Sequence, residues 1–159
     1  MTTPGAATVT AHATTHRLRF NDTDRLGHVN NAVFAVMLEQ GRSELAVAAG
    51  LPVEPPAEGR SAKSGDARSG SAALVIVRLE LDFLQEMTWP GDVRVETEVA
   101  KFGAKSFQLR QRLTSGGDLC ARAMTVLVVM DRATRKAVPL TPEWRGSLDR
   151  WLVPDAPAP

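Results

Sequence analysis

The chain has 159 residues, of which 43% are hydrophobic and 23% charged, and its formal net charge is +1. This length suits one domain with a buried core, and the small net charge excludes strong bulk attraction to nucleic acid or to an anionic membrane. Cys120 is the only cysteine, which excludes an internal disulfide and a cysteine-based zinc site. Without a membrane-spanning apolar run or a signal-peptide pattern near the N-terminus, we expect a cytoplasmic protein with no membrane partner.

The domain is expected to lie between two polar ends. Residues 1–13 and 153–159 are predicted to be flexible, which leaves a single domain over 14–152. Its first predicted element is a strand over 14–20, where apolar side chains alternate with arginines.

A buried helix is predicted next. Asn30 and Asn31 are good N-cap residues, and residues 32–38 are apolar on every side, which indicates burial all round. Gly50, followed by a proline at position 52, is expected to end the helix near residue 49.

The loop between the strand and the helix carries reactive polar groups. Asp22 and Asp24 lie two residues apart, so in an extended segment both carboxylates face one side. Gly27 permits a sharp turn, and His28 follows it. The unpaired N–H groups and positive dipole end of the helix then point toward Asp24 and His28. This pattern predicts an anion hole beside a carboxylate and an imidazole.

Each of these side chains also has a structural interpretation. Asp22 fits a cap of the loop's own N–H groups, and Asp24 fits either a catalytic carboxylate or a cap. His28 fits a group that orients Asp24, activates water or donates a proton, or else a hydrogen-bonding turn residue. Asn30 and Asn31 fit helix caps. In that interpretation only one backbone N–H of this pair needs a function.

The second half of the chain predicts mainly strands. Residues 53–72 contain almost no large apolar group, which predicts a long mobile loop able to close over a ligand. Four strands are then expected at 75–83, 93–99, 107–113 and 119–130. The last is apolar enough to have both faces covered, and another subunit is a candidate cover for one of them. A short helix is expected from Pro142, with Trp144 and Trp151 as docking groups.

These elements predict an α+β domain in which an antiparallel sheet wraps round a long central helix. Uncovered sheet edges favour a dimer whose two sheets join edge to edge. Glu39 and Arg42, three apart on the helix, are expected to form an ion pair that braces the helix in the dimer.

Several motifs together resemble a known family. They are Asp22-Thr23-Asp24, Gly27-His28-Val29-Asn30-Asn31, Phe34, Glu39 and Arg42 on the helix, and the later bends Pro90-Gly91-Asp92 and Lys105-Ser106-Phe107. In these residues and in the order of elements, the sequence resembles the hot-dog-fold acyl-CoA thioesterases of the 4-hydroxybenzoyl-CoA thioesterase type. The resemblance implies hydrolysis of an acyl-CoA thioester at the interface of a homodimer, often within a homotetramer, without a metal or other cofactor.

The resemblance also implies roles for single residues. Asp24 matches the carboxylate that attacks the thioester carbonyl or activates water, and the N–H near Asn31 matches the donor that polarises the carbonyl oxygen. Asn30 and Phe34 are expected beside the substrate. Lys105 and Ser106 match a bend that in relatives lies beside the nucleotide end of coenzyme A.

The sequence departs from the family at three points. Some relatives carry histidine at the position of Asn31, whereas His28 here is placed as in the plant acyl carrier protein thioesterases. An arginine pair found in some members before the matched lysine is here Gly103-Ala104. Candidate replacements for these phosphate contacts are Arg60, Lys63 and Arg68 in the 53–72 loop.

Three functions are compatible with the sequence. The leading one is an acyl-CoA thioesterase that uses Asp24 and the helix N-terminus. The others are a hot-dog hydratase or dehydratase acting on acyl thioesters, and a non-catalytic acyl-CoA binding protein. The sequence leaves the acyl group, and dimer against tetramer, open.

Overall fold

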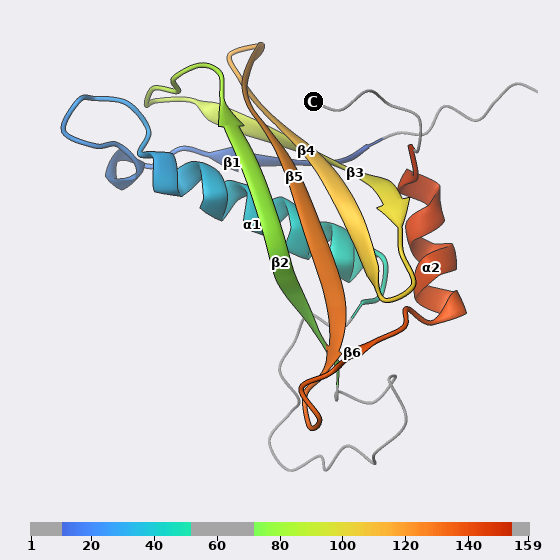
Figure 1. Ribbon diagram of the computed structural model, residues 1–159. Helices are drawn as coiled ribbons and strands as arrows, with labels where there is room; N and C mark the ends of the chain where they lie inside the picture. Colours follow the sequence, from blue (N-terminus) through green and yellow to red (C-terminus); the bar gives the residue numbers. More distant parts are fainter. Residues whose placement is uncertain (1–10, 52–71, 154–159) are drawn as a thin grey trace, which may run out of the picture.

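The strands of this protein form one antiparallel sheet with helices packed against it (Figure 1). The computed structural model describes residues 11–51 and 72–153. The strands are β1 (His12–Arg17), β2 (Ala72–Phe83), β3 (Asp92–Phe102), β4 (Ser106–Ser115), β5 (Asp118–Asp131) and the short β6 (Ala137–Val138). Their order is β1-β3-β4-β5-β2, with β6 paired to β5, so β1 and β2 are the edge strands.

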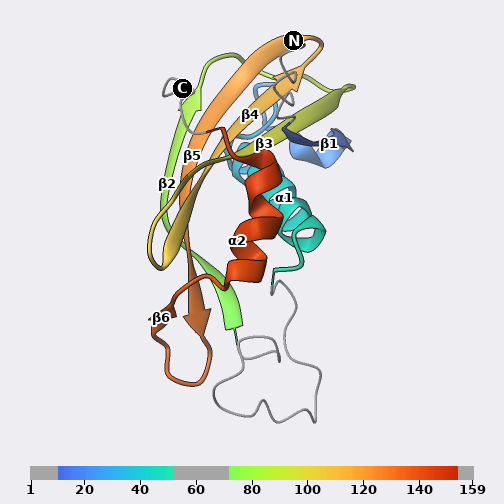
Figure 2. The same ribbon diagram turned by 90° about the vertical axis from the view of Figure 1, so that its right-hand side faces the viewer.

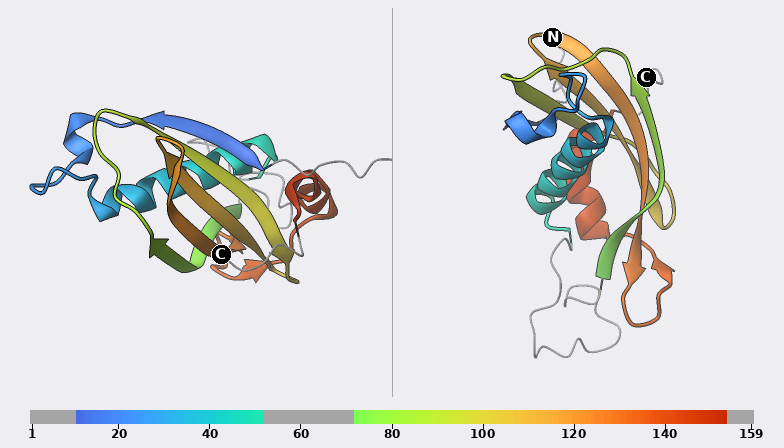
Figure 3. Two further views of the ribbon diagram at one scale, coloured as in Figure 1. Left: turned by 90° about the horizontal axis from the view of Figure 1, so that it is seen from above. Right: turned by 90° about the vertical axis from the view of Figure 1, so that its left-hand side faces the viewer.

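Two helices and two single 3₁₀ turns complete the described fold. These are α1 (Asn31–Ala48), α2 (Pro142–Leu148), η1 (Phe20–Asp22) and η2 (Asp149–Trp151). Helix α1 lies along one face of the sheet, and α2 lies beside the C-terminal end of α1 (Figures 2 and 3). None of the helices in the described ranges has the length and apolar character needed to cross a membrane.

Local signals place the ends of both helices. Asn30 is the N-cap of α1 and accepts a hydrogen bond from Ala32 N at 2.9 Å, and Gly50 follows the C-cap with φ at +68°. Thr141 caps α2 by accepting from Trp144 N. The side chains of Trp144 and Trp151 are buried in the core. The predicted start and end of α1, the predicted start of α2 and the docking tryptophans are therefore confirmed.

The strand prediction is wrong at the N-terminal edge. The predicted strand 14–20 instead begins at His12 and ends at Arg17, so two of the residues assigned to the flexible start belong to β1. Phe20 opens η1 and its side chain is exposed, because the Asp22 carboxylate accepts from Arg19 N and closes a turn there. The predicted loop 53–72 lies outside the described residues, except that Ala72 begins β2.

Burial alternates along most of β3 and β4. The inward side chains of β3 and β4 are buried as predicted: Val93, Val95, Thr97, Val99, Phe107, Leu109, Gln111 and Leu113. Strand β5 was expected to be covered on both faces, with another subunit as a candidate cover for one of them, and the single chain covers one face. Its side chains alternate between buried and half-buried, because α1 covers one face of the sheet only.

Helix α1 is likewise covered on one side only. The prediction of burial all round fails at Val36 and Val47, whose side chains are exposed. On the neighbouring edge strand β2, Val77 is 58% exposed and Phe83 is also exposed. The apolar pattern of α1 and β2 therefore exceeds what this chain alone can bury.

Helix α1 approaches the sheet closely at Gly41. A Cβ atom there would lie 2.7 Å from Cγ1 of Val95, so a larger residue fits only if its neighbours shift. In the next position, Nη1 of Arg42 donates to Oε1 of buried Gln111 at 3.1 Å. Nε2 of Gln111 in turn donates to the Leu38 carbonyl and to Oγ1 of Thr97, both at 3.0 Å. The expected Glu39–Arg42 ion pair is therefore replaced by a link from Arg42 to the sheet.

We predict that Gly41→Ala destabilises the fold by about 1–3 kcal/mol, because the added methyl group overpacks a closed interface. Gly146→Ala in α2 is the matched control, since a Cβ atom there meets nothing within 4 Å. Urea unfolding followed by circular dichroism measures both. Equal stability of the two variants would show that α1 can shift away from the sheet at little cost.

Candidate active site

The loop from Leu18 to Asn30 is held by backbone hydrogen bonds at its base. After η1, Thr23 pairs with Val29 as an isolated antiparallel bridge. Asp24 N donates to the His28 carbonyl at 2.8 Å, and Gly27 adopts φ of +85° in the turn between them. The turn at Gly27 expected from the sequence is confirmed, and it points its tip away from the sheet into solvent.

The two aspartates of the loop have different surroundings. Asp22 is 4% exposed, and its carboxylate accepts from Arg19 N at 2.7 Å and from Arg19 Nη2 at 3.1 Å. Asp24 is exposed, and its Oδ1 accepts from Leu26 N at 2.8 Å. The prediction that both carboxylates face one side of an extended segment is wrong, because Asp22 ends a 3₁₀ turn. The structural interpretation of Asp22 is confirmed.

The loop leads directly into the N-terminus of α1. Asn30 N donates to the Asp22 carbonyl at 2.8 Å, and the Asn30 carbonyl accepts from Val33 N. Asn31 is the first helical residue and is exposed. Within the described part of the chain, its N–H has no hydrogen-bond acceptor. Because the Asp24 side chain caps its own turn, α1 is capped by Asn30 and not by Asp24.

The imidazole of His28 pairs with a residue that the sequence did not single out. Its Nε2 lies 3.2 Å from Oε2 of Glu86, and both side chains are partly exposed. The two segments are joined by Val29 N donating to the Met87 carbonyl at 2.8 Å and by an isolated bridge between His28 and Thr88. Glu86 lies far from the loop in sequence, in the connection between β2 and β3, so no local pattern identifies it.

The other predicted substrate contacts fall into two groups. Phe34 is buried near the start of α1, with its ring in edge contact with Phe83 at 5.2 Å between centroids. Lys105 and Ser106 lie at the bend between β3 and β4, where Gly103 N donates to the Ser106 carbonyl at 2.8 Å. This bend is beside α2, at the other end of the sheet from the start of α1 (Figure 1). Within one chain, Lys105 and Asp24 are not brought together. Arg60, Lys63 and Arg68 lie outside the described residues.

The remaining titratable candidates do not extend the site. Burial raises the pKa of the Cys120 thiol, whose side chain is in the core, as its assignment to a buried strand predicts. In residues 11–51 and 72–153 no group of three histidine, cysteine, aspartate or glutamate side chains is placed to hold a metal ion.

We predict that Asp22→Ala destabilises the protein by about 1–3 kcal/mol, since it leaves the Arg19 N–H without its buried acceptor. Asp24→Ala should cost less than about 1 kcal/mol, because its hydrogen bond is exposed to water. Thermal unfolding of the two variants tests this difference. A larger loss for Asp24→Ala would mean that Asp24, and not Asp22, holds the loop.

Comparison with known proteins agrees with this arrangement. Residues 18–152 match the family model of the thioesterase-like superfamily. No curated protein gives a match. The structure of a thioesterase complexed with coenzyme A and Zn from Thermus thermophilus is similar, with 26% identity, a TM-score of 0.68, and 86% of this chain and 95% of that chain covered.

Two further solved structures share the fold. A predicted thioesterase from Bacillus stearothermophilus has 23% identity and a TM-score of 0.73, with 91% of this chain and 98% of that chain covered. A 1,4-dihydroxy-2-naphthoyl-CoA thioesterase from Synechocystis has 20% identity and a TM-score of 0.71, with 87% and 96% covered. The family match spans most of the chain and includes the loop, α1 and all the strands from β2 to β6. The antiparallel sheet of this chain fits a hot-dog fold. The resemblance noted in the sequence is therefore confirmed, and the chain belongs to the thioesterase-like superfamily.

Proposed function

We propose that this protein hydrolyses an acyl-CoA thioester to a carboxylic acid and free coenzyme A, with Asp24 as nucleophile or general base. One observation carries the proposal. The exposed Asp24 carboxylate sits on a turn that leads straight into α1, where the Asn31 N–H has no acceptor in the described chain. A reactive oxygen and a free donor on one short segment are the two groups that thioester cleavage needs.

The chemistry follows from these groups. Asp24 either attacks the thioester carbonyl carbon, or removes a proton from a water molecule that attacks it. As the carbonyl oxygen gains negative charge, the Asn31 N–H donates to it, and one such donor is typically worth about 3 kcal/mol of barrier. The carbon–sulfur bond then breaks, and the thiolate leaves with a proton from His28 or water. Glu86 holds the His28 ring in one orientation for this step. In the nucleophilic route the departure of the thiolate leaves a mixed anhydride on Asp24, and a water molecule then hydrolyses the anhydride to the carboxylic acid and the free Asp24 carboxylate.

Coenzyme A as the thiol carrier is supported by the Thermus thermophilus thioesterase, which was solved as a complex with coenzyme A. Asn30 and Phe34 are proposed to contact the acyl end, beside Asn31. Lys105 and Ser106 are proposed to contact the nucleotide end. Because they lie across the sheet from Asp24, they serve the active site of a second subunit. The protein is proposed to work in the cytoplasm.

A homodimer, possibly paired into a tetramer, is the assembly that this division requires. β2 is an edge strand with unpaired backbone groups, and apolar side chains are exposed on it and on the adjacent face of α1. Joining two β2 strands edge to edge buries both features. In this assembly each sheet wraps round its α1, as in the hot-dog architecture expected from the sequence.

We predict that Asp24→Asn lowers the release of free coenzyme A by at least about a hundredfold, because the amide is neither a base nor a nucleophile. Thiol release is followed across short, long and aromatic acyl-CoAs, with circular dichroism to confirm folding. Asp149→Asn, an exposed aspartate in η2, is the control and should keep full activity. Undiminished release by Asp24→Asn would refute the role of Asp24.

The same assay separates the two alternative functions. A change in the acyl chain without free thiol would indicate a hydratase or dehydratase. Tight acyl-CoA binding without turnover, in the wild type and in Asp24→Asn, would indicate a binding protein.

We predict that Val77→Lys converts the dimer to monomers and removes most thiol release, because it buries a charge in the joined edge. Light scattering after size-exclusion chromatography measures the mass. Leu119→Lys, a partly exposed position on β5, is the control. A monomeric Val77→Lys protein with full activity would show that one chain holds a complete site.

A further inference from the structure

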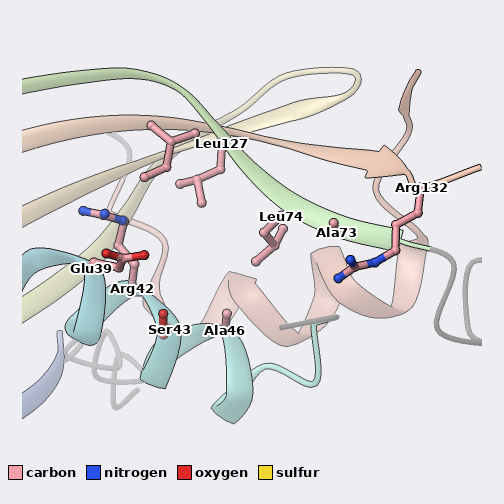
Figure 4. A pocket seen from close by; sticks show the side chains of 9 residues that line it. Glu39, Arg42, Ser43, Ala46, Ala73, Leu74, Leu127 and Arg132 are labelled. Carbon is pink, nitrogen blue, oxygen red and sulfur yellow. The ribbon is translucent and has the colours of Figure 1, made fainter. Parts of the chain in front are cut away.

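A cavity of about 220 Å³ lies between α1 and the edge strand β2, and none of the proposed catalytic residues lines it (Figure 4). Its polar wall comes from Glu39, Arg42 and Ser43 of α1 and from Arg132, which follows β5. Leu74 and Leu127 form much of its apolar wall between these groups. The cavity therefore combines an apolar middle with guanidinium groups on two sides.

Arg42 places a buried positive charge on this cavity. Its residue is 6% exposed, and its hydrogen bond goes to the neutral amide of Gln111. In the described chain no carboxylate lies within 4.0 Å of its guanidinium. Burial lowers the pKa of Arg42, and the charge of nearby Glu39 opposes this effect. A buried cation with a neutral partner is stabilised by an anion that reaches it.

Arg132 adds a second guanidinium from the other side. Its side chain points into the cavity, and its Nε donates to the Ala72 carbonyl at 3.0 Å, which fixes its position against β2 (Figure 4). Glu39 is the acidic side chain of the cavity wall.

We propose that this cavity binds an organic monocarboxylate, with the carboxylate on a lining guanidinium and the apolar body against Leu74 and Leu127. An apolar protein cavity of about 150 Å³ is large enough to hold benzene. The larger cavity here accommodates a body the size of benzoate or hexanoate. A carboxylic acid is also the product of the proposed reaction, but binding in the cavity does not depend on that reaction.

The test is calorimetric titration of the wild-type protein with benzoate and hexanoate, and with the uncharged benzamide and hexanamide. We expect each acid to bind about tenfold or more tightly than its amide, because hydrogen bonds to a charged group are stronger. Acids and amides that bind equally, or acids that do not bind at all, would overturn the proposal.

Variants locate the binding in the cavity. Ser43→Glu adds a negative charge to the wall at an exposed helix position and should weaken acid binding about tenfold or more. Arg132→Gln removes a lining charge and should act in the same direction. Ala48→Glu adds the same charge to α1 outside the cavity and should leave binding unchanged. Equal effects of Ser43→Glu and Ala48→Glu would place the acid elsewhere.

The carboxylate in the cavity could belong to a free acid or to the acyl group of the substrate, and rates of thiol release distinguish these two sources. If the ligand is a free acid, benzoate inhibits thiol release in the wild type and not in Ser43→Glu. If it is the terminal carboxylate of a dicarboxylic acyl-CoA, glutaryl-CoA is preferred over butyryl-CoA in the wild type, and Ser43→Glu abolishes the preference. If the wild-type protein released no thiol from any substrate, the proposed hydrolysis would be refuted. The binding of acids measured by calorimetry would still test the cavity proposal by itself.

Discussion

Helix α1 packs against the inner face of β3 at Gly41, and this contact sets the position of the helix on the sheet. The missing side chain lets the helix approach Val95 closely, and the following Arg42 reaches Gln111. Gln111 is fully buried and also bonds Thr97 and the Leu38 carbonyl, so a shift of the helix leaves these polar groups unpaired. Each buried group left unpaired costs about 1–3 kcal/mol. Helix α1 is thereby fixed in both distance and rotation.

Fixing α1 also fixes the reactive loop at its start. Asn30 caps the helix through its side chain and joins Asp22 through its backbone N–H. The Asp22 carboxylate accepts both of its hydrogen bonds from Arg19, whereas the Asp24 carboxylate is exposed to solvent. The two aspartates look equivalent in the sequence but differ in the structure. Asp22 stabilises the loop, and Asp24 lies exposed on it.

The features predicted correctly from the sequence are those determined by residues close together in the chain. Alternation gave the buried faces of β3 and β4, and Asn30, Gly50 and Thr141 marked helix ends, because these signals act within a few residues. The errors came from contacts between distant segments. Phe20 left its predicted strand because Asp22 bonds the backbone ahead of it, and Arg42 bonds Gln111 instead of its helical neighbour Glu39.

The candidate site was predictable to the same extent. Asp24, His28 and the helix start lie in one stretch, so their neighbourhood could be read from spacing. Glu86 reaches His28 only because the connection between β2 and β3 folds back over the loop. The cavity between α1 and β2 could not be foreseen, since its walls come from three separate parts of the chain.

The proposed dimer would account both for the exposed apolar side chains and for the separation of Lys105 from Asp24 within one chain. A monomer leaves Val36, Val77 and Phe83 in water, although each square ångström of apolar surface removed from water contributes about 25 cal/mol. It also leaves Lys105 across the sheet from Asp24. A twofold pairing through β2 reverses the second sheet, so the Lys105 bend of one copy comes to the end that carries Asp24 in the other. The exposed apolar surface lies on β2 and the adjacent face of α1. Burying this surface in a dimer would also bring Lys105 of one copy toward Asp24 of the other.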